Sequence, residues 1–155
     1  MNRQPFSWLR IAVVAGALAA AGCAGISASS LQPGVSTLPE IEAALGAPAM
    51  VWKNPDGSAQ LAYPFGPSGT QTFMVFVGAD GKFQRITGVL NETQFRLVQP
   101  GMTKEQVLRM LGPSDSLLTQ AFPRTDMLAW TWLYCAPGNF QNYFNVIFDT
   151  NTGLV

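Results

Sequence analysis

The stretch Gly101-Met-Thr-Lys-Glu-Gln-Val-Leu-Arg-Met-Leu-Gly112 contains the start and stop signals of one short helix. Thr103 precedes Gln106 by three residues, which is the spacing of a capping box, where the two side chains bond to free amides at a helix start. Val107 and Leu111 are four residues apart, so both lie on one helix face. The closing glycine and the proline that follows it end the helix.

The sequence contains an earlier copy of this pattern, Gly34-Val-Ser-Thr-Leu-Pro-Glu-Ile-Glu-Ala-Ala-Leu-Gly46. Thr37 and Glu40 repeat the capping box, and Ile41 and Leu45 repeat the apolar face. The two capping threonines are 66 residues apart (103 minus 37). A second helix of the same kind is therefore predicted near the start of the chain.

The similarity continues into segments that have strand character. Leu61-Ala-Tyr matches Leu128-Ala-Trp, and Phe76-Val-Gly-Ala-Asp-Gly81 matches Ile147-Phe-Asp-Thr-Asn-Thr-Gly153 with one extra residue in the turn. A helix cap, an aromatic strand and a hairpin that recur in this order predict two tandem units of one kind. Units of about 60 residues bury only part of their surface, so we expect the two to pack against each other.

The expected fold class is α+β, with one unit in residues 33–90 and the other in residues 91–155. In chain order the patterns predict a helix at 38–45, a short extended piece at 49–53, strands at 59–64, 72–77 and 82–89, a helical turn at 91–97, the second capped helix, a weakly extended piece at 117–120, and strands at 127–134 and 143–149. The first unit ends with a predicted strand of about eight residues, whereas the corresponding strand of the second unit, after the turn at Asn151-Thr-Gly153, has only three. Either this last strand is a stub, or the sequence is shorter than the functional gene product.

Residues 1–22 have the pattern of an export signal. Arg3 and Arg10 give a positive start, and the apolar run Ile11–Ala21 is short for a membrane span. The run Leu18-Ala-Ala-Ala-Gly-Cys23 resembles the lipobox of bacterial lipoprotein signal peptides, in which the cysteine becomes the lipidated first residue. The alternative is an ordinary cleaved signal with an incidental cysteine.

If Cys23 is acylated, residues 23–32 form the lipidated terminus and a tether that holds the first unit close to the bilayer. More than one acyl chain makes such an attachment stable. The residue after Cys23 is Ala24, which by resemblance to the lipoprotein sorting rule implies the outer membrane, facing the periplasm. Cys135 would then be a single cysteine without an intrachain disulfide, and we expect a small buried strand residue rather than a redox or intermolecular site.

Composition argues against an enzyme. The chain has no histidine, which removes the catalytic triads and metal sites that need one. Nine basic and nine acidic residues balance, with no basic run, so a nucleic-acid partner is not expected. The acidic residues fall at helix starts, turns and strand ends. We predict no catalytic residue, no metal site and no cofactor.

Aromatic residues supply the candidate binding site. Trp130, Trp132 and Tyr134 alternate and share one strand face, Tyr143 lies opposite them in the predicted hairpin, and Trp52 is a similar candidate in the first unit. One interpretation is that these rings form the core under the helices. The other is an exposed patch that anchors a partner protein, since Tyr and Trp dominate interface hot spots. Small residues on the opposite strand face favour the second interpretation, because they suit close helix packing.

The run Val98-Gln-Pro-Gly-Met-Thr-Lys-Glu-Gln-Val107, followed by Leu111-Gly112 and Trp130-Thr-Trp132, resembles the SmpA/OmlA (BamE-like) family of small outer-membrane lipoproteins. The resemblance covers residues 91–155 and, more weakly, residues 31–89. It implies a fold of two helices packed on a three-stranded antiparallel sheet in each unit. Family members carry one such domain, whereas two are predicted here.

The tandem arrangement is also similar to the β-lactamase inhibitory proteins, whose two related domains present an aromatic-rich sheet to an enzyme and carry a disulfide each. The first resemblance implies a non-catalytic lipoprotein that acts as a protein-interaction module in β-barrel assembly or envelope integrity, with the barrel-assembly machinery as partner. The second implies an inhibitor-like protein that grips a periplasmic enzyme through its aromatic sheet face. Binding of a lipid between the units is a third possibility, for which the sequence shows no pocket signature.

Overall fold

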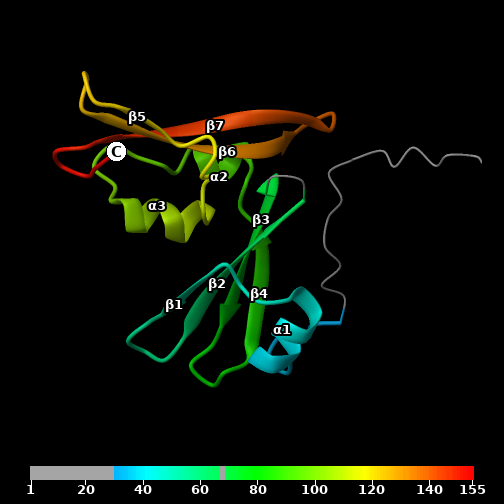
Figure 1. The fold of residues 1–155 in the computed structure, drawn as a ribbon. Helices are drawn as coiled ribbons and strands as arrows, with labels where there is room; N and C mark the ends of the chain where they lie inside the picture. Colours follow the sequence, from blue (N-terminus) through cyan, green and yellow to red (C-terminus); the bar gives the residue numbers. More distant parts are fainter. Residues whose placement is uncertain (1–29, 67–68) are drawn as a thin grey trace, which may run out of the picture.

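The computed structural model describes residues 30–66 and 69–155, which form two antiparallel sheets with short helices packed on them (Figure 1). The fold is therefore mixed helix and sheet, as the sequence predicts. The first sheet has the order β1-β2-β3-β4. Its strands are β1 (Met50–Lys53), β2 (Ala59–Phe65), β3 (Gln71–Val77) and β4 (Phe83–Gly88).

The first sheet has four strands, so the expectation of three per unit is wrong for this half of the chain. The additional strand is β1, which the sequence indicates only as a short extended piece. It pairs with β2 from Met50↔Ala62 to Lys53↔Ala59. The intervening turn closes through a hydrogen bond from the Asn54 amide to the Ser58 carbonyl (2.8 Å). The Asn-Pro-Asp-Gly turn thus brings residues 50–53 alongside β2, where they pair as a strand although their own strand signal in the sequence is weak.

Helix α1 (Leu38–Leu45) covers one face of the first sheet. The predicted apolar pair is buried, with Ile41 fully inaccessible, and packs on alternate residues of β2 and β3 such as Leu61 and Val75. Leu31 joins the same core although it lies in the expected tether. The folded part of the chain therefore reaches back to at least this residue.

The second sheet has the order β5-β6-β7, with α2 and α3 on one face. These elements are α2 (Glu92–Phe95), α3 (Lys104–Leu111), β5 (Gln120–Phe122), β6 (Met127–Ala136) and β7 (Phe140–Asp149). The hairpin of β6 and β7 pairs ten residues, from Met127↔Asp149 to Ala136↔Phe140. The hairpin is longer than the predicted strands at 127–134 and 143–149 because the connecting loop has only three residues. Two of these, Gly138 and Asn139, have positive φ, which allows the tight turn.

Both capped helices are confirmed. Gln106 and Thr103 exchange two hydrogen bonds at the start of α3, of 2.8 and 3.2 Å. At α1 the Glu40 carboxylate accepts both from the Thr37 amide (2.6 Å) and from the Thr37 hydroxyl (2.8 Å). Each capping threonine also forms an isolated β-bridge to a residue beyond a hairpin turn, Thr37 to Lys82 and Thr103 to Leu154.

Helix α3 joins the two halves, because it packs on the first sheet as well as on its own (Figure 1). Leu108 lies against the cluster of Trp52, Ala62, Met74 and Val89 on the face of the first sheet that is opposite to α1. The Arg109 guanidinium donates to Asn54 Oδ1 (3.0 Å), and the Gln60 side chain donates to the Arg109 carbonyl. The expected packing of one half against the other is confirmed.

Candidate protein-binding face

One face of the second sheet is covered by the helices, and three of the predicted site residues lie on it. Trp132 is 1% exposed and Tyr134 is 7% exposed, while Trp130 is half-buried with its ring centroid 4.7 Å from that of Phe148. All three belong to the core that contains α3. The interpretation of these rings as an exposed partner-binding face is therefore wrong, and the core interpretation is confirmed.

Large rings occupy this face because α3 offers only medium-sized side chains to it. Val107 and Leu111 are the fully buried residues of α3, so the sheet must supply the volume that fills the core. Trp132 also satisfies the end of α3, since its indole Nε1 donates to the Gly112 carbonyl (3.2 Å). The Phe95 ring of α2 stacks on Phe144 with centroids 4.1 Å apart.

Trp52 is likewise buried rather than presented to a partner. Trp52 is a residue of β1 and is 7% exposed. It belongs to the cluster of the first sheet against which Leu108 of α3 packs. The Arg109 guanidinium carbon lies 5.7 Å from the centre of its ring, within the range of a cation–π contact. Trp52 thus helps to hold the two halves together, which corrects its assignment as a partner-binding candidate.

The opposite face of the second sheet, which we call the outer face, carries exposed apolar side chains. Tyr143 of β7 is the one predicted candidate on it, and its side chain is 58% exposed. Alternation along the strands places Phe122, Met127 and Ile147 on the same face, with exposed fractions of 43%, 38% and 41%. An antiparallel sheet with one solvated face normally alternates apolar and polar residues, so four exposed apolar residues together are unusual.

The middle of the outer face is a shallow groove between the exposed side chains. Its floor is formed by Ala129 and Thr131, each 8% exposed. The Thr131 hydroxyl donates to Asn145 Oδ1 (2.7 Å), which satisfies the polar groups at the floor. Small floor residues flanked by Phe122 and Tyr143 leave room for a side chain of a partner to insert.

A turn next to the groove adds a further exposed apolar residue. Leu117 is 92% exposed, and its backbone amide donates to Asp115 Oδ1 (2.8 Å). The Thr119 hydroxyl donates to the Asp115 carbonyl (3.1 Å). Leu118, which follows Leu117 in this turn, lines the groove. The turn is therefore held by its own hydrogen bonds in a conformation that leaves Leu117 in solvent.

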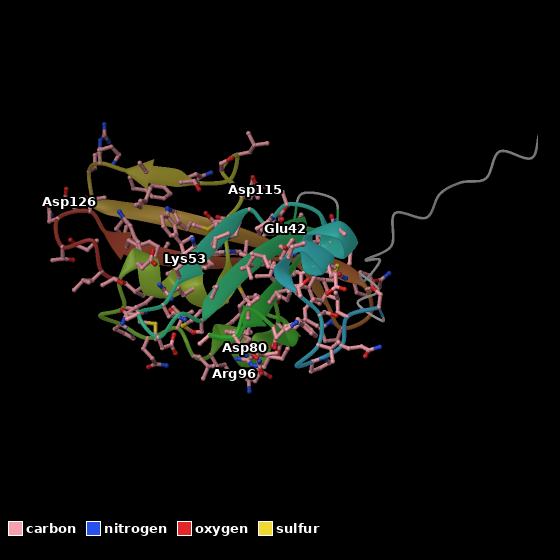
Figure 2. The ribbon with its side chains drawn as sticks, turned by 90° about the horizontal axis from the view of Figure 1, so that it is seen from below. Glu42, Lys53, Asp80, Arg96, Asp115 and Asp126 are labelled. Atoms are coloured by element: carbon pink, nitrogen blue, oxygen red, sulfur yellow. The ribbon has the colours of Figure 1, made fainter. Side chains whose placement is uncertain are left out.

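Charged residues lie at the ends of the outer face and not on it. Among its strand positions in β5, β6 and β7 only Asp149, the last residue of β7, is charged. Hydrogen bonds from the Thr152 backbone amide and hydroxyl and from the Asn151 amide lower the pKa of Asp149. Asp126 lies in the turn between β5 and β6, at the tip of the sheet (Figure 2). The face itself is thus uncharged, which suits contact with an apolar protein surface.

Cys135 lies near the end of β6, where it is half-buried and disulfide-bonded. The expectation of a buried cysteine without a disulfide is therefore wrong. That expectation followed from assigning Cys23, the other cysteine of the chain, to lipidation. Cys23 lies outside the described residues, as do the predicted signal peptide and most of the predicted tether.

Within residues 30–66 and 69–155, no three acidic or cysteine side chains come together as a metal site would require. No helix of this described part has the length and apolar character needed to cross a bilayer. Comparison with protein-family models, curated proteins and solved structures found no match for this chain. The interpretation of the outer face therefore depends on the side chains themselves.

The sequence does contain a signal for the outer face. The alternation that places Trp130 and Trp132 on one side of β6 also places Met127 and Ala129 on the other. The small size of Ala129 and its neighbours suggests helix packing, but in the structure Ala129 and Thr131 form the floor of the groove, and Leu118 lines its side. Which side of an amphipathic strand meets the helix depends on the volume that each side must fill, and that volume is a property of the assembled fold.

Proposed function

We propose that this chain is a non-catalytic protein-interaction module that binds its partner through the outer face of the second sheet. The observation that carries the proposal is the cluster of Phe122, Met127, Tyr143 and Ile147, all exposed, around an uncharged groove. Exposed apolar clusters of this kind on soluble domains are typical of contact sites. Tyr is among the residues most often found at the energetic centre of interfaces.

The proposal includes a tandem origin for the two halves. Two observations support it. The glycines after α1 and α3 have nearly the same conformation, with φ and ψ of 83° and −169° at Gly46 and of 76° and −169° at Gly112. Each capping threonine bridges to the residue that follows a hairpin turn. A BamE-like unit that occurs twice accounts for both, with β1, β2 and β3 matching β5, β6 and β7 in order, and with β4 as the strand of the first copy that has no counterpart in the described part of the second.

We further propose a lipid anchor on Cys23 and a position at the periplasmic side of the bacterial outer membrane. The support is the lipobox-like run and the Ala24 that follows it. Cys135 is disulfide-bonded in the structure, and Cys23 is the only other cysteine of the sequence. The anchor therefore requires a mature chain without a disulfide between the two, because one sulfur atom cannot hold both a lipid thioether and a disulfide. Mass spectrometry of the purified chain without reductant separates these two forms. A diacylglyceryl group on Cys23 supports the anchor, and a peptide that joins Cys23 to Cys135 contradicts it.

The partner that we favour is the barrel-assembly machinery, which follows from the resemblance to the SmpA/OmlA family. The second candidate is a periplasmic enzyme that the chain inhibits. The outer face gives that alternative specific support, because Tyr143 and Phe122 flank a groove that could receive a protruding side chain. The two candidates use the same face and differ in what binds to it.

Co-purification from membranes tests the proposal. The intact chain is compared with Tyr143→Ser/Ile147→Ser, which changes two exposed residues of the outer face. The matched control is Val51→Ser/Leu97→Ser, which changes two similarly exposed apolar residues elsewhere, at 50% and 51%. Both double variants should fold, because neither changes a buried side chain.

Recovery of barrel-assembly components with the intact chain and the control, but not with the outer-face variant, supports the first candidate. Recovery of one soluble enzyme in the same pattern supports the second. If the partner is retained equally by all three proteins, the outer face is not the binding site and the proposal fails.

A further inference from the structure

The groove on the outer face runs along β6, between one wall from β5 with the turn before it and another wall from β7. Each wall carries one carboxamide side chain. In the register of the sheet Gln120 of β5 lies opposite Ala129, and Asn145 of β7 lies opposite Thr131. The small floor therefore has an amide group on either side of it.

The groove is long in the direction of the strands. Phe122, which lines it at one end, lies opposite Met127, and Tyr143, which lines it at the other end, lies opposite Leu133. Met127 and Leu133 are six positions apart in β6 (133 minus 127). Six residues of a strand extend over about 20 Å, so the groove matches the length of an extended segment of about six residues.

The two carboxamides have hydrogen-bonding groups to offer to a ligand. The Thr131 hydroxyl donates to Asn145 Oδ1 (2.7 Å), which holds this oxygen at the floor and leaves the two N–H donors of Asn145 Nδ2 on the other side of the amide. Within the part of the chain that the structure describes, neither these donors nor the Gln120 carboxamide has a hydrogen-bond partner. Both side chains are exposed, so a ligand that covers them must replace their bonds to water.

The charge of the groove restricts what binds in it. Its lining contains no aspartate, glutamate, lysine or arginine. A charged group of the partner would lose its water there without gaining an opposite charge, which is strongly unfavourable. The ligand is therefore uncharged where it meets the groove. Apolar walls that carry amide groups match a peptide backbone with apolar side chains, since the backbone has N–H and C=O groups along its whole length.

An extended conformation suits both the walls and the floor. The backbone groups of an extended segment point to both of its sides, so a segment that lies along β6 presents hydrogen-bonding groups to each wall. Its side chains point alternately toward the floor and away from it, which places those toward the floor about 6.6 Å apart. Ala129 and Thr131 are two residues apart in β6 and have the same spacing, and their small side chains leave room above them.

We propose that the partner occupies the groove with an extended, uncharged segment of about six residues, and that Gln120 and Asn145 bind the backbone of this segment. The inference deepens the proposed function and rests on it, because both concern the outer face. The segment lies on the face of the sheet and pairs with no edge strand. The two carboxamides position it along the groove, while the exposed apolar side chains around them supply the contact area.

Peptide selection with the full-length protein in detergent tests this inference. The probe is a library of random peptides displayed on phage. We expect the selection to enrich peptides that have no charged residue over a stretch of about six residues. The dissociation constant of the most enriched peptide is then measured by fluorescence anisotropy with the intact chain and with two variants.

The first variant is Gln120→Leu/Asn145→Leu, which removes both carboxamides and keeps the groove uncharged. It should fold, because both side chains are exposed and the Thr131 hydroxyl retains the Leu118 carbonyl, 3.3 Å away, as an acceptor. We expect the peptide to bind this variant about tenfold more weakly than the intact chain, as the loss of two hydrogen bonds implies.

The matched control is Gln84→Leu/Asn151→Leu, which removes two exposed carboxamides outside the groove. It should bind the peptide as the intact chain does. A selection that enriches no such peptide, or equal affinity of the peptide for all three proteins, overturns the inference.

Co-purification from membranes separates this result from a failure of the proposed function. A partner that is lost with Tyr143→Ser/Ile147→Ser but retained by Gln120→Leu/Asn145→Leu binds the outer face without its backbone being held, which overturns the inference alone. A partner that both variants retain contradicts the proposed function as well. Loss of the partner with both variants, and not with Gln84→Leu/Asn151→Leu, supports both.

Discussion

The glycines that end the two capped helices allow a matched test of how the halves pack together. Gly46 and Gly112 have positive φ and ψ near 180°, a conformation that residues with a side chain adopt at a cost of about 1–3 kcal/mol. A Cβ added at Gly46 would meet no atom within 4 Å. A Cβ added at Gly112 would lie 2.7 Å from Thr72 Cγ2 of the first sheet.

The difference between the two alanine variants should therefore report the interface alone. Carbon atoms in packed cores normally approach to about 3.5–4.0 Å, so Gly112→Ala creates an overlap of about 1 Å. Thr72 is 1% exposed and β-branched, which leaves its methyl group little room to move. Overpacking of this kind costs about 1–3 kcal/mol. We expect Gly112→Ala to lower the free energy of unfolding by that amount more than Gly46→Ala does.

Urea denaturation followed by tryptophan fluorescence measures both values. Thr72→Ser removes the methyl group that clashes and keeps the hydroxyl, so it should recover part of the loss in the Gly112→Ala background. Equal destabilisation by the two alanine variants, or no recovery with Thr72→Ser, would refute the packing of α3 on the first sheet.

Individual contacts give three further predictions. Arg109→Ala removes the hydrogen bond to Asn54 and should lower the free energy of unfolding by about 1 kcal/mol, whereas Arg96→Ala, whose ion pair is exposed, should change it little; urea denaturation measures both. Trp132→Phe leaves the buried Gly112 carbonyl without its donor and should lower the free energy of unfolding by about 1–3 kcal/mol in the same urea assay. An unchanged urea denaturation curve would contradict this. The lowered pKa of Asp149 contributes stability above the ordinary carboxyl pKa of about 4, and this is lost as the pH falls through the lowered value. The stability difference between the intact chain and Asp149→Asn should therefore shrink below about pH 4, and a difference that is constant with pH would contradict this.

The helices could be predicted from the sequence because their signals are local. Thr103 and Gln106 satisfy amides within one turn, and no distant residue is needed for them to do so. The same is true of Asn91, whose side chain accepts from the Gln94 amide (3.1 Å) at the start of α2. The turn at 54–57 is also recognisable from the sequence, although the strand before it is not.

The candidate site could not be predicted correctly because it depends on contacts between distant segments. Trp132 is buried since α3 and α2 lie over it, and Trp52 is buried since Leu108 and Arg109 reach it from the other half of the chain. Alternation along β6 separates its residues into two sets but does not indicate which set meets a helix. Tyr143 is exposed, as expected of a partner-binding residue, but it belongs to the opposite face of the sheet from Trp132.

Site-specific photocrosslinking in the native envelope tests the outer-face proposal most directly. A photoreactive residue replaces Tyr143 on the outer face or Leu97, which is similarly exposed in the connection between α2 and α3. The account predicts a crosslink from position 143 to a different protein, and none from position 97. Crosslinks of equal yield from both positions, or none to another protein from position 143, would contradict it.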